Sequence, residues 1–252
     1  MPPIEINGQT VSDVVVNGQS VNEVTANGQT VFTAIPDSVV AHWAADDLSS
    51  GFDEWVDRES GFVLDNFGST YLEDGINGNP SVATDGSDDF LVNNNDIDLG
   101  SVDAEKTFVS VFEPLSSDIG YICHQADSGS FSSQEFSLFW DGDLLFTLGG
   151  SGNNLNGSQE PTIASATYSR PELSGTVGLN GNEIDADVGD IDRSEPYGFH
   201  VGARGDVEDD PTVTEVHFEG RIGDIIVAEG RSIDDYQQIN SFLSNKYGIE
   251  LS

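Results

Sequence analysis

Hydrophobic and polar residues alternate in short runs along most of this chain, and turn residues separate the runs. Residues 107–112 alternate, residues 136–140 and 144–148 flank Asp141-Gly142, and residues 176–179 lead into Asn180-Gly181. Alternation with a period of two predicts β-strands, and Asp-Gly and Asn-Gly pairs predict hairpin turns between them. Further strands are expected over 183–184, 199–201, 213–218 and 221–227. Residues 149–159 are rich in Gly, Asn and Ser without a period and predict a loop.

The first 33 residues repeat one short phrase with a period of ten. Its copies are Ile6-Asn7-Gly8-Gln9-Thr10-Val11, Val16-Asn17-Gly18-Gln19-Ser20-Val21 and Ala26-Asn27-Gly28-Gln29-Thr30-Val31. Each Asn-Gly pair suits a tight hairpin turn, so the segment predicts very short strands. Such units cannot bury a core alone. We therefore expect them to dock on the body, on symmetry mates or on a larger assembly.

One amphipathic helix is predicted near the C-terminus. It begins after Ser232, an N-cap residue followed by acids in the first turn, and ends at Gly248, with Lys246 in its last turn. Its apolar stripe consists of Tyr236, Ile239, Leu243 and Tyr247. Many strands and one helix predict an all-β two-sheet sandwich with a helix packed on its side. Pro36 divides a β-repeat anchoring and oligomerisation segment (1–36) from a single body (37–252).

Charge changes this picture more than any other property. The chain has 45 acidic and 8 basic residues, a formal net charge of −37, yet 37% of its residues are hydrophobic. A disordered chain would be less apolar. The composition is typical of a folded protein from an extreme halophile, since at about 1 M salt the Debye length falls to about 3 Å and self-repulsion is screened. We do not expect nucleic-acid binding, because the sequence has no basic patch that could neutralise phosphates.

The charge is also uneven. Residues 1–36 hold only Glu5, Asp13 and Glu23 and no basic residue, so they carry −3 of the net −37 and leave −34 for the rest. A low charge density on residues 1–36 is expected if this segment docks on another protein surface or intertwines with other copies of the chain. The single cysteine, Cys123, lies in an apolar run, excludes an internal disulfide and is expected to be buried. We expect no signal peptide and no membrane span, and hence retention in the cytoplasm or release inside a virus particle.

Several motifs resemble the laminin-G-like or concanavalin-A-like jelly rolls. Residues 43–48 are similar to that family's opening strand and turn, residues 75–82 and 85–91 to its early Gly-Ile-Asn-Gly and Asp-Gly-x-Asp-Asp turns, and residues 218–249 to its closing strand and helix. The resemblance implies a concanavalin-A-like jelly-roll sandwich, a fold that serves lectins, adhesion modules, glycosidases and virion parts. The repeats are similar to attachment segments in tail fibres and spikes of tailed viruses.

The segment Glu183-Ile184-Asp185-Ala186-Asp187 is similar to the strand that carries both carboxylates of concanavalin-like endoglucanases. Alternation places its acids on one face, but a retaining pair needs a defined spacing of about 5–5.5 Å. Asp187 is one methylene shorter than the glutamate of that motif. We therefore expect no catalytic residues and no enzyme activity. Asp185, Asp187, Asp190 and Asp192 are dense enough to hold Ca²⁺ through hard oxygen ligands, with solvated surface as the alternative.

The remaining candidates are aromatic and imidazole side chains. His42, His124, His200 and His217 lack metal-ligand spacing, so we expect strand or turn residues rather than a zinc site. Trp43 and Trp140 lie in apolar strands and are expected in the core. Trp55 lies in a loop-like polar stretch and is the candidate for exposure and stacking on a sugar.

Together these patterns favour a structural and adhesive virion component of a haloarchaeal tailed virus, namely a capsid turret, spike or tail fibre. It would present a lectin-like jelly roll to a host surface glycan or S-layer protein. Residues 4–33 would bind other virion proteins and join a homo-oligomer, with a trimer favoured and a pentamer as the alternative. A halophilic glycoside hydrolase and a free carbohydrate-binding module are the rival hypotheses.

Overall fold

The computed structural model describes most of the body and the strands of the N-terminal repeats. The described residues are 5–6, 9–10, 15–16, 19–20, 23–26, 29–33, 35–93, 105–127, 134–148, 151–169, 174–187, 196–205 and 214–252. In this part of the chain no helix is long and apolar enough to cross a membrane.

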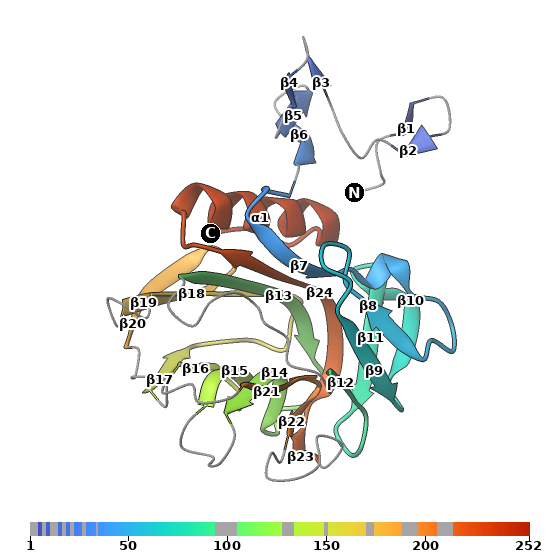
Figure 1. The fold of residues 1–252 in the computed structure, drawn as a ribbon, viewed down its shortest axis with the longest axis vertical. Helices are drawn as coiled ribbons and strands as arrows, with labels where there is room; N and C mark the ends of the chain where they lie inside the picture. The colour runs from blue at the N-terminus through green and yellow to red at the C-terminus, as the bar shows by residue number, and fades with distance from the viewer. Residues whose placement is uncertain are drawn as a thin grey trace.

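Two antiparallel sheets of eight strands each form the body and pack face to face as a sandwich (Figure 1). The first sheet has the order β10 (Thr70–Ile76), β11 (Asn79–Asp85), β24 (Glu219–Glu229), β13 (Lys106–Pro114), β18 (Thr162–Ser169), β19 (Ser174–Leu179) and β20 (Asn182–Asp187), and β7 (Val39–Trp43) also pairs with β24. The second has the order β17 (Ser151–Leu155), β16 (Leu144–Leu148), β15 (Gln134–Trp140), β14 (Gly120–Asp127), β21 (Pro196–Val201), β12 (Phe90–Asn93), β9 (Val63–Phe67) and β8 (Glu54–Val56). A two-stranded sheet, β22 (Ala203–Gly205) with β23 (Thr214–His217), lies beside the second.

The main core fills the space between the sheets. Trp43 of the first sheet stacks on Phe199 of the second, with ring centroids 5.4 Å apart, and Phe112 meets Trp140 edge-on at 6.3 Å. All four side chains are at most 2% exposed. Each such burial stabilises the fold by about 1.5–3 kcal/mol. The expectation that Trp43 and Trp140 lie in the core is confirmed.

Helix α1 (Ile233–Tyr247) covers the outer face of the first sheet and makes a second, smaller core (Figure 1). The Ser232 side chain accepts a hydrogen bond from the Asp235 amide, and Gly248 ends the helix in the left-handed region with a φ of 65°. The predicted stripe is buried at all four positions, which are Tyr236, Ile239, Leu243 and Tyr247. The helix therefore begins, ends and faces the sheet as its sequence predicts.

The predicted hairpin turns are present. Asn180 and Gly181, with φ of 49° and 85°, join β19 to β20, and Leu179 pairs with Asn182 across the turn. The N-terminal strands form three separate hairpins, β1–β2, β3–β4 and β5–β6, with bounds Glu5–Ile6, Gln9–Thr10, Val15–Val16, Gln19–Ser20, Glu23–Ala26 and Gln29–Thr33. Within each hairpin the Asn-Gly pair alone separates the last paired residues, which are Ile6 with Gln9, Val16 with Gln19, and Ala26 with Gln29.

None of these six strands pairs with a described strand of the body, and Figure 1 shows the hairpins extending beyond α1. The all-β jelly-roll sandwich with one C-terminal helix and a preceding β-repeat segment is thus confirmed. One local prediction was wrong. The stretch 149–159 contains strand β17, which pairs with β16 at the edge of the second sheet. Backbone hydrogen bonds to a neighbouring strand made it a strand without an alternating pattern.

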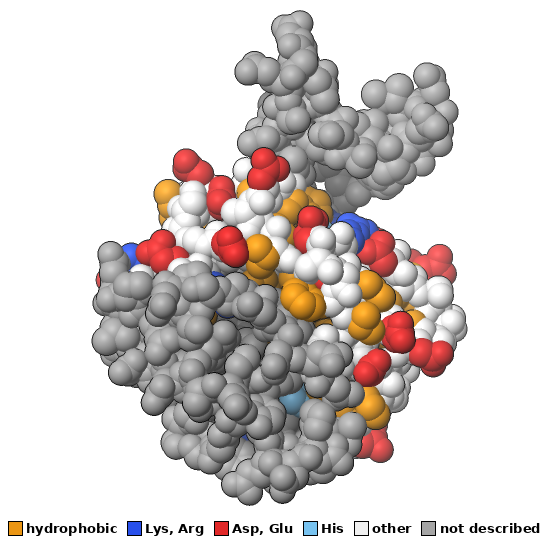
Figure 2. Space-filling view, viewed as in Figure 1, with side chains coloured by type: hydrophobic (Ala, Val, Ile, Leu, Met, Phe, Trp, Pro, Cys, Tyr) orange, Lys and Arg blue, Asp and Glu red, His pale blue; other side chains and the backbone are white. Residues whose placement is uncertain are grey.

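The surface matches the composition. Figure 2 shows acidic side chains scattered over the described face of the body, with few basic ones among them. The apolar side chains on this face lie between the acidic groups. Among the acidic side chains whose burial the structure describes, Asp57 and Asp224 are buried and the others lie at least partly exposed around a conventional apolar core.

Candidate functional site

A polar pocket opens at the outer face of the first sheet, where α1 begins. Its volume is about 290 Å³. Its lining comes from three neighbouring strands, the β24–α1 connection and the helix, and consists of Thr167, Thr176, Glu183, Arg231, Ile233 and Tyr236. Ligand pockets commonly measure roughly 300–1,000 Å³, so this one suits a small ligand.

Alternation along the edge strands explains why polar groups gather here. Ala164 and Ala166 of β18 and Val177 of β19 face the main core, which sends Ser165, Thr167 and Thr176 to the opposite face. The helix covers apolar residues farther along the sheet. Beside the N-terminal end of the helix, hydroxyl and carboxylate side chains occupy the outer face of β18, β19 and β20. The threonine hydroxyls are 2.9 Å apart and hydrogen-bonded to each other.

The helix touches the sheet at one close point beside the pocket. The Tyr236 hydroxyl lies 2.7 Å from the Ser165 hydroxyl. Gly178 makes room for this contact, because a Cβ at that position would collide with the Tyr236 oxygen. Burial raises the pKa of Tyr236, and the nearby Glu183 charge raises it further, against a lowering hydrogen bond from Ser165. The tyrosine therefore stays protonated and can donate.

Arg231 and Ile233 complete the pocket on the helix side. The Arg231 guanidinium donates to the Glu105 carboxylate at 3.1 Å and to the Ser174 hydroxyl at 2.8 Å, which orients it over the strand ends. Ile233 is 56% exposed. The pocket thus offers a carboxylate acceptor in Glu183, donors in Arg231 and in one of the two bonded threonines, and the apolar side chain of Ile233.

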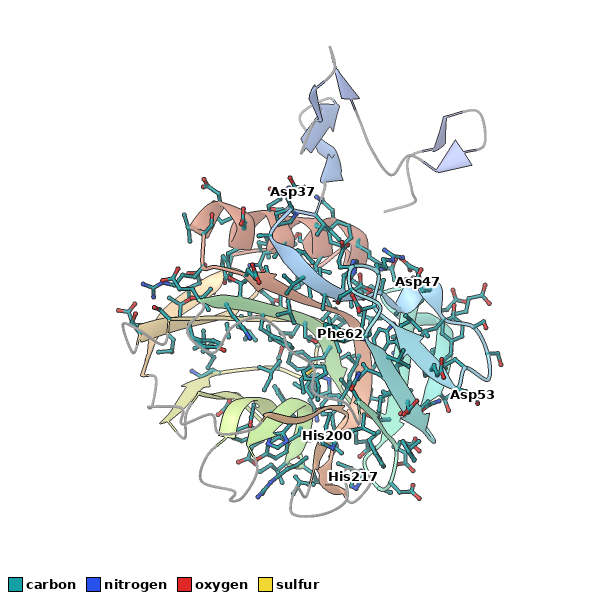
Figure 3. All side chains as sticks on the ribbon, in the orientation of Figure 1. Asp37, Asp47, Asp53, Phe62, His200 and His217 are labelled. Atoms are coloured by element: carbon teal, nitrogen blue, oxygen red, sulfur yellow. The ribbon has the colours of Figure 1, made fainter. Side chains whose placement is uncertain are left out.

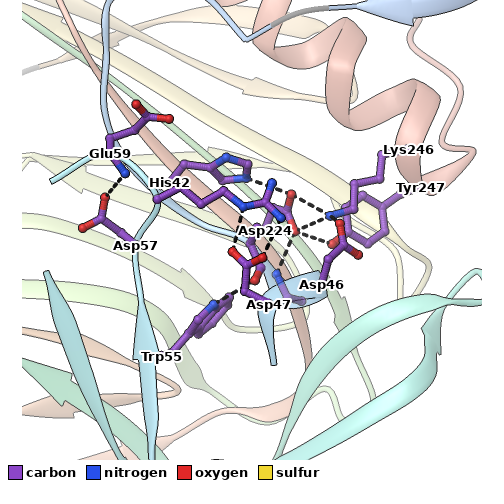
Figure 4. Close-up of polar contacts among 12 residues, drawn as sticks. His42, Asp46, Asp47, Trp55, Asp57, Glu59, Asp224, Lys246 and Tyr247 are labelled. Atoms are coloured by element: carbon purple, nitrogen blue, oxygen red, sulfur yellow. Dashed lines mark hydrogen bonds and ion pairs between the residues drawn. The ribbon is translucent and has the colours of Figure 1, made fainter. Parts of the chain in front are cut away.

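A second polar cluster centres on Asp224 and lies under the other end of the helix (Figure 4). The Asp224 carboxylate accepts hydrogen bonds from His42 at 3.0 Å, from the Ala45 amide at 3.1 Å, from Lys246 at 2.9 Å and from Tyr247 at 2.8 Å. These donors come from β7, the 3₁₀ helix η1 (Ala45–Asp47) and α1. The cluster therefore ties α1 and the first strand of the body to the centre of the first sheet.

The charges in this cluster compensate each other. Burial alone would raise the pKa of Asp224, but Lys246 and then His42 lower it more, so it lies well below the usual range. Burial and the Asp224 charge raise the pKa of Tyr247 well above normal. Because the His42 and Asp224 side chains are 0% exposed, no substrate reaches them. The Asp224 cluster is a structural clasp.

The predicted sugar-stacking residue is in the core instead. Trp55 is 0% exposed, and its indole nitrogen donates to the Ala44 carbonyl at 3.1 Å. The prediction that Trp55 is exposed was wrong. Its neighbours Glu54 and Val56 are exposed on β8, and alternation sends the tryptophan between them inward. The ring has no free face for a sugar.

The predicted calcium group is described only in part. Asp185 is exposed on β20, where it pairs with Thr176 of β19. Asp187 lies in β20, but its side chain, and all of Asp190 and Asp192, fall outside the described residues. The calcium site at these residues stays a prediction. Glu183, discussed above as a carboxylate of the endoglucanase-like motif, lines the pocket.

Another acidic group was not predicted as a metal site. Asp85, Asp88 and Asp89, at the turn after β11, present carboxylate oxygens within 4.8 Å of one another. Backbone amides of the same turn lower the pKa of Asp85, while burial and its two acidic neighbours raise the pKa of Asp89. The turn's own amides thus explain the position of the Asp85 carboxylate.

Two further buried titratable groups lie in β14 of the second sheet. Burial raises the pKa of the Cys123 thiol, which is 0% exposed, as the sequence predicts for a buried cysteine. His124 is 2% exposed, and burial, followed by the charges of His200 and Arg204, lowers its pKa to about 3. His124 is thus a neutral, buried imidazole.

The described residues form a two-sheet jelly-roll sandwich with a polar pocket beside the start of α1. No protein-family model matches the chain, and no curated protein matches it in sequence. Among solved structures it is similar to Trypanosoma rangeli sialidase in complex with sialic acid, with a TM-score of 0.64 at 12% identity. That likeness covers 92% of this chain and 37% of the sialidase, so the chain spans just over a third of that enzyme.

Two smaller neighbours have the same fold. Domain 4 of an extracellular arabinanase from Geobacillus stearothermophilus, in complex with arabinotriose, matches with a TM-score of 0.57 at 14% identity, over 81% of this chain and 98% of the domain. Botulinum neurotoxin type C, whose cell entry depends on two ganglioside molecules, matches with a TM-score of 0.56 at 14% identity, over 84% of this chain and 52% of the toxin chain. At these identities the likeness establishes the fold.

Proposed function

We propose that this protein is a non-enzymatic glycan-binding module and that the pocket beside the start of α1 holds a sugar. The pocket's mixed lining is the observation that carries the proposal. Glu183 accepts hydrogen bonds from sugar hydroxyls, Arg231 and Thr176 donate to them, and Ile233 packs against the apolar face of the ring. The fold's occurrence in an arabinotriose complex and in a ganglioside-dependent toxin supports this class of ligand.

The sugar proposal is tested with the full chain on a glycan array in about 3 M KCl, followed by titration of the best ligand. Glu183→Gln removes the charged acceptor and should weaken binding by about tenfold or more, since hydrogen bonds to charged groups contribute about 1.5–3 kcal/mol. Glu73→Gln is the matched control, because Glu73 is exposed on β10, at the opposite edge of the same sheet. Absence of glycan binding, or equal weakening by both changes, would refute the proposal.

The rival enzymatic function uses the same residue and is tested in the same samples. A reducing-sugar assay on β-glucans should show no turnover. Turnover that disappears in Glu183→Gln would replace the binding function with a glycoside hydrolase.

We further propose that the protein is displayed on a virion of a haloarchaeal tailed virus, as a turret, spike or tail fibre that meets a host glycan or S-layer protein. The three weakly charged hairpins support an attachment role, since they pair with no described strand of the body and, beyond β6, which lies against α1, extend away from it (Figure 1). Residues 4–33 would join a homo-oligomer, with a trimer favoured, because unpaired strand edges invite pairing between chains. Antibody labelling of virions in negative stain tests the location.

Salt and truncation test the remaining parts of this proposal. The melting temperature should fall steeply between about 3 M and about 0.1 M KCl, because screening of the −37 charge weakens as the Debye length grows from about 3 to about 10 Å. Light scattering in high salt should show an oligomer for the full chain and a monomer for residues 37–252. Equal melting temperatures would refute the halophilic assignment, and a monomeric full chain would refute self-assembly.

A further inference from the structure

His124 and His200 lie directly opposite each other on neighbouring strands of the second sheet. They are a paired position in the β14–β21 register, and their ring centroids are 6.2 Å apart. Both are buried, with 2% and 1% of their surface exposed. Figure 3 labels His200 on the side of the sandwich away from α1, whereas the pocket is lined by strands of the first sheet and by α1. The pair is therefore independent of the proposed sugar site.

The burial of His124 is unusual because its polar atoms are unused. Neither Nδ1 nor Nε2 of His124 has a hydrogen-bond partner among the described residues. Its ring instead packs edge-on against Tyr121, with centroids 5.3 Å apart. A buried polar group without a partner reduces stability by about 1–3 kcal/mol, and in native proteins it often marks an ion or a water.

We propose that His124 and His200 bind a late first-row transition-metal ion of the zinc and copper class. Imidazole nitrogen is a preferred ligand of these ions, which use the lone pair that His124 leaves unpaired. With metal–nitrogen distances of about 2.0–2.1 Å, two imidazoles on one ion place their ring centroids roughly 5–6.4 Å apart, from a tetrahedral to an opposed arrangement. The observed centroid distance of 6.2 Å lies within that range.

Arg204 limits how strong this site is. Among the described residues, Arg204 is a cation whose charge acts on His124, and its guanidinium lies 5.9 Å from the centre of the Tyr121 ring. Its charge opposes a divalent ion, and the two imidazoles add no negative charge. We therefore expect one weak, exchangeable ion per chain, completed by water or chloride, rather than a structural zinc that the fold requires.

The test uses the full chain in high salt, stripped of metal with EDTA and then dialysed free of it. Zn²⁺ is added in the presence of excess Ca²⁺, which occupies surface carboxylates through oxygen ligands. Wild-type protein should bind one Zn²⁺ per chain by elemental analysis. His124→Phe should bind at least about tenfold more weakly, since even loss of a supporting contact to a metal ligand weakens binding by about 10–100-fold. His217→Gln, a change in another strand histidine, should bind like the wild type.

A measurement on the unaltered protein guards against misfolding of the variant. Cu²⁺ bound to wild type should show nitrogen hyperfine splitting from two imidazoles in its electron paramagnetic resonance spectrum. Oxygen-only coordination, no stoichiometric Zn²⁺ in wild type, or equal binding by His124→Phe would each overturn the proposal.

Discussion

The two buried polar clusters of this protein differ in how their charges and lone pairs are used. In the first sheet, His42 is 0% exposed and lies 3.0 Å from the Asp224 carboxylate, which also contacts Lys246 and Tyr247. In the second sheet, His124 is 2% exposed and contacts the Tyr121 ring and the His200 imidazole. The same residue type at similar burial thus bonds a carboxylate through Nε2 in one sheet, with Nδ1 left without a partner, whereas neither ring nitrogen of His124 has a partner among the described residues of the other sheet.

This difference separates a structural role from a ligand-binding one. A satisfied cluster resists change because each partner is needed, and removing one leaves a buried charge behind. An unsatisfied group lowers stability until a ligand arrives. Variants of the Asp224 cluster therefore test the stability of the body, and variants of the His124–His200 pair test ligand binding.

The largest expected effect comes from breaking the Asp224 cluster. Asp224→Asn keeps the shape but removes the carboxylate that neutralises Lys246, whose side chain is 13% exposed. We expect the free energy of unfolding to fall by about 3–5 kcal/mol in high salt, as for one partner removed from a buried ion pair. Denaturant titration followed by tryptophan fluorescence measures it.

Asp46→Asn is the control for that change. Asp46 also bonds Lys246, at 2.6 Å, but its side chain is 43% exposed. Lys246 keeps Asp224 in this variant, so the loss should stay within about 1 kcal/mol. Similar losses in both variants would mean that the burial of Asp224 is not what makes it important.

The sequence predicted the parts of this fold that local chemistry decides. The Asn180-Gly181 turn and the cap residues Ser232 and Gly248 specify their conformation through their own backbone and side chains, and the structure has them as expected. Strand β17 was missed because its partner strand, not its own pattern, makes it a strand. Trp55 was misassigned because its burial depends on a contact with Ala44 across a loop.

Both sites depend on residues that are distant in sequence. The pocket combines Thr167, Glu183 and Arg231, and the histidine pair combines β14 with β21. Spacing rules for metal ligands treat His124 and His200 as scattered, since only the strand register brings them together. The signal that could have found them is strand pairing, which alternation alone does not supply.

The second prediction concerns acid. The pKa of His124 is about 3 in the fold and about 6.5 in the unfolded chain, so only the unfolded state takes up a proton between these values. Above about pH 6.5 neither state binds this proton, and the free energy of unfolding is unaffected by it. As pH falls below this value, the free energy of unfolding decreases by up to about 1.4 kcal/mol per pH unit. The lowered pKa of Asp224 acts only below about pH 4, the usual range for Asp in unfolded chains.

The window from about pH 6.5 to pH 4 therefore lies above the range in which Asp224 acts, and a variant of His124 tests its share of the acid loss there. In metal-free protein, His124→Phe should flatten the fall in unfolding free energy across this window, while Asp224→Asn should shift the whole curve down and keep its slope. Urea titrations at several pH values measure both. An unchanged slope in His124→Phe would show that another group causes the acid loss.

The third prediction concerns Tyr236, whose substitution should have a smaller effect on stability. Tyr236→Phe removes the hydroxyl that bonds Ser165 at 2.7 Å beside the pocket. We expect a loss of about 0.5–1.5 kcal/mol, the range for one neutral hydrogen bond. Tyr71→Phe, on β10 at the far edge of the sheet, should change stability by less than about 0.5 kcal/mol. If both variants lost the same stability, the Tyr236–Ser165 bond would not anchor the helix.

The smallest effect is expected at an ion pair that has ideal geometry but lies on the surface. Arg58 donates to both Asp47 oxygens, at 2.7 and 2.9 Å, and the two side chains are 38% and 42% exposed. Asp47→Asn should reduce the free energy of unfolding by no more than about 1 kcal/mol. The loss should shrink further between about 1 M and 3 M KCl, because salt screens exposed charges, whereas the loss from Asp224→Asn should stay constant. Chemical denaturation at both salt concentrations measures the contrast. A salt-independent loss at Asp47 as large as that at Asp224 would mean that geometry, and not burial, sets the strength of ion pairs in this protein.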